Sequence, residues 1–90
     1  MHVEFRNSFL KDIKRLKDRK EKELVKKVIE ECEAAESSRQ ILHCEPLTSK
    51  GKFFKIKYGQ YRFGVYINKG TIEFLKFGTR QSFYKDFPPY

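Results

Sequence analysis

Cations and aromatic side chains alternate along residues 53–66, and a second basic and aromatic cluster follows at residues 78–84. The first stretch contains Lys55, Lys57 and Arg62, and the second contains Arg80 and Tyr84. Grouped cations can hold RNA phosphates and stabilise a phosphorane, and a phenol ring can stack on a base. Because the RNA 2′-hydroxyl can be the nucleophile, neither a Ser–His–Asp set nor a metal is required. The pattern predicts an RNA-binding face able to cleave a phosphodiester.

A predicted turn at residues 59–60 fixes how these side chains face one another. Glycine at the first central position is typical of a type II′ hairpin turn, which places Lys57 opposite Arg62 and Lys55 opposite Gly64. Like charges directly opposite each other destabilise a strand pair. We expect Gly64 to leave open surface beside Lys55. A solvated cationic surface is the alternative interpretation, but the register, the aromatic neighbours and the scarcity of acids favour a phosphate-binding face.

Arg80 and Tyr84 follow the last predicted strand and are four positions apart, so one helical turn places them on the same side. Taken alone, this spacing better fits a packing tyrosine beside a surface arginine, and it points to an RNA site only when joined to Lys55, Lys57 and Arg62. Further RNA contacts are predicted at Lys52, Tyr66 and Lys76. No unambiguous general base is present, and a crowded lysine is the candidate.

The net charge is distributed unevenly. Residues 1–45 carry a net charge of +1 and residues 46–90 carry +7, and twelve of the fourteen aromatic residues lie in the second half. This asymmetry indicates a polyanion partner. Cys32 and Cys44 are predicted to be reduced packing residues, and the sequence predicts no metal site and no cofactor. Without an apolar run of ~20 residues or a signal peptide, we expect a cytoplasmic protein with no membrane partner.

The elements that carry this face predict a single α+β domain over residues 1–90, of order β-α-α-β-β-β. A helical hairpin packs on a small, mostly antiparallel sheet. Asn7 or Ser8 is expected to cap the first helix, and Ser37-Ser38 to end the second. The predicted segments are a strand at 2–6, a helix near 8–17, a charged turn at 17–22 leading into the second helix, a polar connection at 39–52 and a third meander strand at 71–77.

Alternation assigns the side chains of the predicted sheet to two faces. The face toward the helices is expected to contain Phe54, Ile56, Tyr58, Tyr61, Phe63, Val65 and Ile67. The other face is expected to contain Lys55, Lys57, Arg62 and Tyr66. In the third strand, Ile72 and Phe74 are predicted to point one way and Leu75 and Phe77 the other, as in a central strand covered on both faces.

The chain resembles the RelE/ParE superfamily of type II toxin–antitoxin toxins over nearly its whole length. The motifs are Phe5-x-x-Ser8-Phe9-x-Lys11, Lys55-x-Lys57, Tyr61-Arg62 and Gly78-Thr79-Arg80…Tyr84-x-x-Phe87-Pro88. The two middle motifs are most similar to the RelE branch, whose members cut mRNA in the ribosomal A site. This resemblance implies catalytic roles for Lys55 and Lys57, phosphate binding and charge stabilisation by Arg62 and Arg80, and base stacking by Tyr84.

The same resemblance implies a function and partners. The expected protein is a ribosome-dependent mRNA endoribonuclease toxin that inhibits translation and is neutralised by a cognate antitoxin, with no homo-oligomer required. Thr79 stands where several relatives carry histidine, so a histidine cannot transfer the proton at that position. Two alternatives stay open: a ParE-like DNA gyrase inhibitor without nuclease activity, and a non-enzymatic RNA-binding module.

Overall fold

The order of the elements agrees with the sequence prediction. Two short elements are added between the second helix and the hairpin, a 3-10 helix at Ser38–Gln40 and a strand at Cys44–Pro46. The computed structural model describes residues 1–47 and 51–87. The elements are β1 (His2–Phe5), α1 (Asn7–Lys14), α2 (Arg19–Ala34), η1 (Ser38–Gln40), β2 (Cys44–Pro46), β3 (Phe53–Tyr58), β4 (Tyr61–Asn68), β5 (Thr71–Thr79) and α3 (Arg80–Asp86). The α+β class is confirmed, and the expected helical turn after β5 is the helix α3. The predicted polar connection contains β2, while its residues 48–50 and Pro88 of the last motif lie outside the described residues.

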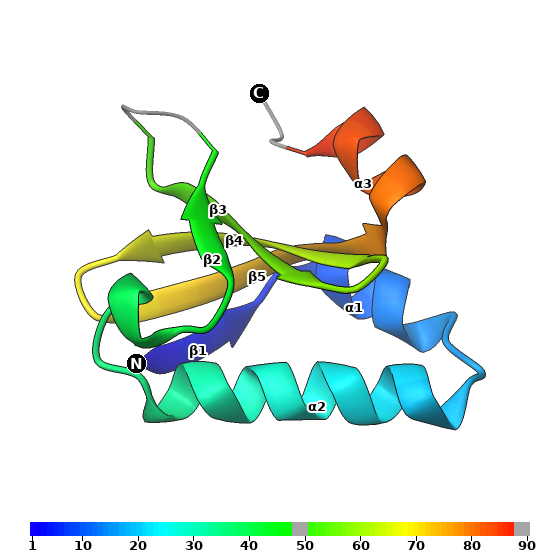
Figure 1. Ribbon diagram of the computed structural model, residues 1–90, viewed down its shortest axis with the longest axis horizontal. Coiled ribbons are helices and arrows are strands. Elements are labelled where there is room, and N and C mark those ends of the chain that lie inside the picture. Colours follow the sequence, from blue (N-terminus) through cyan, green and yellow to red (C-terminus); the bar gives the residue numbers. More distant parts are fainter. Residues whose placement is uncertain (48–50, 88–90) are drawn as a thin grey trace.

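The strands form one sheet in the order β1-β5-β4-β3-β2. β1 runs parallel to β5, and the other neighbours are antiparallel, so the sheet is mostly antiparallel as expected. Figure 1 shows α2 lying along one side of the sheet and α3 on the opposite side. No helix in residues 1–47 and 51–87 is long and apolar enough to span a membrane.

The predicted hairpin register is confirmed. Lys57 lies opposite Arg62 and Lys55 lies opposite Gly64. Gly59 has a φ of +57°, and Gln60 is not among the residues with positive φ, which is the pattern of a type II′ turn. The turn therefore places Lys55, Lys57 and Arg62 on one face of the sheet, which we call the basic face.

The main core fills the space between the sheet and the helices α1 and α2. Phe9 from α1 and Val28 and Cys32 from α2 are fully buried in it. All seven residues predicted for this sheet face belong to the core or pack against it: Phe54, Ile56, Tyr58, Tyr61, Phe63, Val65 and Ile67.

A β-bulge changes the predicted facing of β5. The register with β4 shifts so that Gly64 lies opposite Lys76 while Val65 lies opposite Phe74, leaving Leu75 as the extra residue. Phe77 consequently returns to the main core, and its predicted orientation away from it was wrong. Leu75 does point to the other face, where it packs with α3, so β5 is covered on both faces as expected.

The helix boundaries differ from the prediction. α1 ends at Lys14 and α2 begins at Arg19, because the Asp18 carboxylate accepts a hydrogen bond of 2.8 Å from the Lys20 backbone N–H and caps α2. The second helix ends at Ala34, before the predicted stop at Ser37-Ser38. Neither Asn7 nor Ser8 caps α1; both lie inside it.

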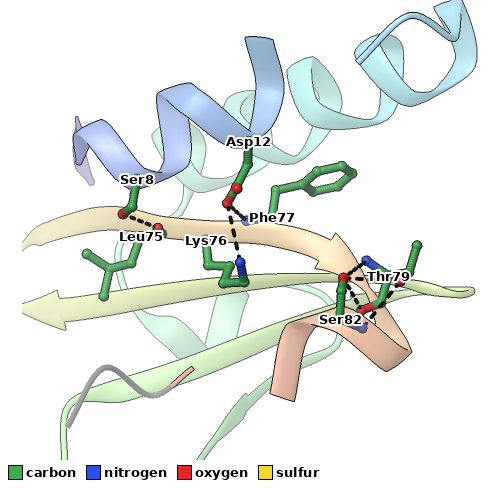
Figure 2. Close-up of polar contacts among 7 residues, drawn as sticks. All are labelled: Ser8, Asp12, Leu75, Lys76, Phe77, Thr79 and Ser82. Atoms are coloured by element: carbon green, nitrogen blue, oxygen red, sulfur yellow. Dashed lines mark hydrogen bonds and ion pairs between the residues drawn. The ribbon is translucent and has the colours of Figure 1, made fainter. Parts of the chain in front are cut away.

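Two side chains of α1 bond to the backbone of β5 beyond the point where β1 ends. The Ser8 hydroxyl donates to the Leu75 carbonyl at 2.6 Å, and the Asp12 carboxylate accepts from the Phe77 N–H at 3.0 Å. Figure 2 shows both contacts on one side of α1. The positions are four residues apart and so face the same direction. They satisfy backbone groups that a sixth strand would otherwise bind.

Candidate nucleic-acid interface

Lys55 and Tyr84 meet between β3 and α3. The Lys55 Nζ donates to the Tyr84 hydroxyl at 3.0 Å and lies 5.3 Å from the centre of the ring. The hydrogen bond from Lys55, with a second contribution from Arg62, lowers the pKa of Tyr84. The tyrosine side chain nevertheless stays 47% exposed, so one of its surfaces is accessible to a ligand. Two residues that are 29 positions apart in the sequence thus form one contact.

Arg62 is the most deeply buried charged residue of this face. It is only 8% exposed, and its Nη1 donates to the carbonyls of Gly59 and Tyr61 at 2.7 and 2.9 Å. Among the described residues its Nε has no hydrogen-bond partner. A buried N–H without an acceptor costs free energy, so an anion that reached it would be bound strongly. Arg62 therefore stabilises the hairpin and also retains one buried donor without an acceptor.

Glu45 is the residue that the sequence analysis missed. It lies on β2 opposite Lys55, and its carboxylate is 3.2 Å from the Lys57 Nζ and 4.0 Å from the Lys55 Nζ. The scarcity of acids in residues 46–90 therefore does not leave these two cations without a counter-charge. The strand is only three residues long and contains Pro46, which disfavours a strand except at a sheet edge. The edge position of β2 explains why this proline is tolerated.

Gly64 does not leave open surface beside Lys55, contrary to the prediction. A Cβ at this position would lie 2.7 Å from ring carbons of Phe87, so the aromatic ring occupies the space that the missing side chain leaves. Phe87 and Phe83 form a second, smaller core with Leu75. Gly64 is thus needed for α3 to pack on the sheet and to bring Tyr84 to Lys55.

The start of α3 is fixed by Thr79. Its hydroxyl accepts from the Ser82 N–H at 3.5 Å while the Ser82 hydroxyl accepts from the Thr79 N–H at 3.2 Å, a reciprocal cap shown in Figure 2. The Arg80 N–H donates to the Gln60 carbonyl at 2.7 Å, which ties α3 to the hairpin turn. The Arg80 side chain is exposed. Arg80 and Tyr84 are one turn apart on α3, as the spacing predicted.

Each of the three additional RNA-binding candidates has a local partner outside this contact. Lys52 donates to the Asn68 side chain at 2.6 Å, and Lys76 is 4.0 Å from the Asp12 carboxylate on α1. Tyr66 packs edge-on against Phe53, with ring centres 5.2 Å apart. The structure therefore groups Lys55, Lys57, Arg62 and Tyr84, with Arg80 one turn away, and engages the other three candidates in local contacts. The described residues contain no group of three or more His, Cys, Asp or Glu side chains placed to bind a metal ion.

Known proteins similar to this chain are toxins and toxin–antitoxin complexes. Toxin RelE3 of Methanocaldococcus jannaschii is 33% identical over 89 residues, which cover 98% of this chain and 100% of that protein. The RelB–RelE antitoxin–toxin complex from Methanococcus jannaschii matches with 30% identity and a TM-score of 0.78, covering 96% of this chain and 100% of that one.

A more distant structure shares the fold. The toxin–antitoxin complex RelBE2 from Mycobacterium tuberculosis has a TM-score of 0.65 at 23% identity, covering 88% of this chain and 96% of that one. No protein-family model matches the chain. The archaeal similarity nevertheless extends over the whole domain and includes the strands and the helix that carry the basic face. The chain belongs to the RelE family of type II toxin–antitoxin toxins.

Proposed function

We propose that this toxin is a ribosome-dependent endoribonuclease that cleaves mRNA in the cytoplasm and so inhibits translation. The observation that carries the proposal is the contact between Lys55 and the exposed Tyr84, with Lys57 and the buried Arg62 on the same face. A phosphate between these cations would have charge-assisted donors on two sides, and the tyrosine ring would offer a stacking surface to the adjacent base.

Cleavage on this face requires only the groups that RNA and these side chains supply. The 2′-oxygen attacks the phosphorus, the bond to the 5′-oxygen breaks, and the products are a 2′,3′-cyclic phosphate and a 5′-hydroxyl. When the phosphate takes the place of the Glu45 carboxylate beside Lys57, that carboxylate becomes available to accept the 2′-hydroxyl proton. The departing oxygen takes a proton from the Lys55 ammonium. Arg62 and Arg80 stabilise the charge on the phosphorane.

The ribosome is expected to be necessary because the site has no metal ligand group in the described residues and only a half-exposed carboxylate as a base. Such a site depends on an external scaffold to hold the 2′-hydroxyl in line with the leaving group. We also propose a cognate antitoxin as a partner, since the archaeal relative of known structure is an antitoxin–toxin complex. An acidic antitoxin segment that folds on binding fits the +7 charge of residues 46–90.

The test compares cleavage of free mRNA with cleavage of mRNA in translating ribosomes, by mapping new 5′ ends. The wild type should cut only in ribosomes, and Arg80→Ala should cut at least about 10²-fold more slowly. Glu45→Gln should also slow cleavage, because the amide cannot accept a proton. Lys26→Ala, at an exposed position on α2, is the control and should cut normally. Equal cutting of free and ribosomal mRNA contradicts the proposal, and gyrase inhibition without cutting supports the ParE-like alternative.

A further inference from the structure

The charges of α2 oppose the helix dipole at both ends. Its first turn contains Arg19, Lys20 and Lys22 around a single acid, and its last turn contains no base. Residues 28–36 carry four glutamates and no lysine or arginine. Cations at a helix N-terminus and anions at its C-terminus interact unfavourably with the helix dipole and destabilise the helix. The stability of α2 alone does not explain this arrangement.

The N-terminal end of α2 and the end of α1 form a basic hairpin tip, which we define as residues 11–22. This segment has seven Lys or Arg and three acids, a net charge of +4. All seven cations are exposed: Lys11, Lys14, Arg15, Lys17, Arg19, Lys20 and Lys22. Two of the three acids serve the fold, because Asp12 bonds to β5 and Asp18 caps α2. The surface of the tip therefore presents mainly positive charge.

The basic hairpin tip lies at the same end of the molecule as α3. In Figure 1, the turn between α1 and α2 and the helix α3 both lie at the right-hand end of the sheet. A crevice of about 350 Å³ connects the two and is lined by Arg15 of the tip and by Thr79, Ser82 and Lys85 around the start of α3. Its lining contains the bases Arg15, Lys76 and Lys85 and the acids Asp12 and Glu21, so the tip and the start of α3 border one groove with a small positive excess.

The basic hairpin tip contains no aromatic residue, whereas the basic face is bordered by the exposed Tyr84. This difference indicates which class of RNA the tip binds. Proteins that hold single-stranded RNA combine cations with aromatic stacking, while folded RNA is bound largely through its shape and phosphates. A helical hairpin whose exposed side chains are mainly cations fits the second class.

We propose that the basic hairpin tip binds backbone phosphates of folded ribosomal RNA while the basic face holds the mRNA. This inference rests on the proposed ribosome-dependent function and adds a second contact surface to it. The reversed charges of α2 place its positive end at the ribosomal RNA and its negative end away from it, so the helix also orients the toxin during approach.

The test uses the variant Lys17→Gln/Lys20→Gln/Lys22→Gln in the full-length toxin, with binding to ribosomes measured across a series of salt concentrations. Losing three phosphate contacts should reduce the steepness of log Kd against log salt by about 2 to 3 and weaken binding about tenfold or more. The charge-matched control Lys26→Gln/Lys27→Gln/Lys69→Gln should change both much less. The tip variant should melt no lower than the wild type, because two of its three changes remove cations from the first turn of α2.

Two comparisons separate this inference from the proposed function. Arg80→Ala should lose cleavage but keep most of its ribosome binding, whereas the tip variant should lose binding and keep its cleavage rate once ribosomes saturate it. The tip variant should also bind single-stranded mRNA as the wild type does. Wild-type ribosome binding and salt dependence in the tip variant would overturn the inference even if cleavage is confirmed. An equal loss on single-stranded RNA would overturn the assignment to folded RNA.

Discussion

The two faces of the β-sheet are built from similar aromatic residues but are covered to very different extents. Among the described residues, α1 and α2 bury a core of twelve on one face, and on the other the short α3 forms a buried core of three, Leu75, Phe83 and Phe87. The larger core consists of hydrophobic residues, while Phe83 of the smaller one packs against Tyr84, which bonds to Lys55. A domain of 90 residues thus assigns stability to one face and its proposed chemistry to the other.

Truncating one phenylalanine on each face should separate these two roles. Phe63→Ala removes a fully buried ring from the main core and should cost about 3–5 kcal/mol of unfolding free energy. Phe83→Ala removes an equally buried ring from the α3 cluster and should release α3 while most of the sheet stays folded. Urea unfolding followed by circular dichroism, together with the cleavage assay, measures both effects. Global unfolding of Phe83→Ala at the same urea concentration as Phe63→Ala would show that the two faces are not independent.

Arg62 tests whether one residue contributes to both roles. Arg62→Ala should slow cleavage by about 10²-fold or more, and it should also lower the unfolding free energy by about 1–3 kcal/mol, because two carbonyls lose a charged donor. Removing the repulsion between Arg62 and Lys57 would by itself raise the free energy of unfolding. The loss of the buried Arg62 hydrogen bonds is expected to be larger than this gain. Arg62→Lys, which keeps the charge, should recover part of the stability. Rates must be compared per folded molecule, and full activity of folded Arg62→Ala would remove this residue from the site.

Gly64 measures how closely α3 must approach the sheet. Gly64→Ala places a methyl group against the Phe87 ring and should cost about 1–3 kcal/mol through overpacking. In a Phe87→Ala background the same change should cost much less, since the clash is absent. A double-mutant cycle with thermal unfolding gives the coupling energy. Additive costs would mean that the ring does not occupy the space above Gly64.

The main core should also make the protein sensitive to alkaline pH. Burial raises the pKa of Cys32 to about 12 and that of Cys44 to about 11, from an ordinary value of 9.0. Both thiols therefore favour folding below pH 9, and each loses its contribution as the pH rises from 9 toward its folded pKa, by about 1.4 kcal/mol per pH unit. Urea titrations between pH 8 and 11 measure this loss. Cys32→Ala should flatten the dependence, and an unchanged slope would contradict the assignment.

Short-range features of this fold could be read from the sequence, and long-range ones could not. The hairpin register follows from Gly59, because a two-residue turn fixes the pairing of its flanking strands. β2 escaped prediction because its pairing with β3, and not its own composition, makes it a strand. The bulge at Leu75 and the packing of Phe87 over Gly64 depend on contacts between segments far apart in the chain.

The residues of the candidate site also fall into those that local sequence rules predicted and those that only long-range contacts bring to the site. Lys55, Lys57 and Arg62 were predicted to share a face because alternation along two paired strands is a local rule, and the structure agrees. Tyr84 joined them through the i, i+4 spacing from Arg80 and the resemblance to known toxins. Glu45 carries no signal of its own, since a single acid in a polar segment is ordinary. Only the pairing of β2 with β3 brings it to the lysines.

The two bonds from α1 to β5 have a consequence for how this toxin behaves when it is only partly folded. β1 pairs with β5 only up to Phe74, so residues beyond that point would otherwise expose backbone donors and acceptors along a hydrophobic strand. Such an edge is a template for joining strands from other molecules. By occupying the Leu75 carbonyl and the Phe77 N–H, Ser8 and Asp12 keep one copy of the protein from adding to the next. We expect Ser8→Ala/Asp12→Ala to raise the fraction lost to aggregates during refolding, measured by light scattering, more than it lowers the melting temperature.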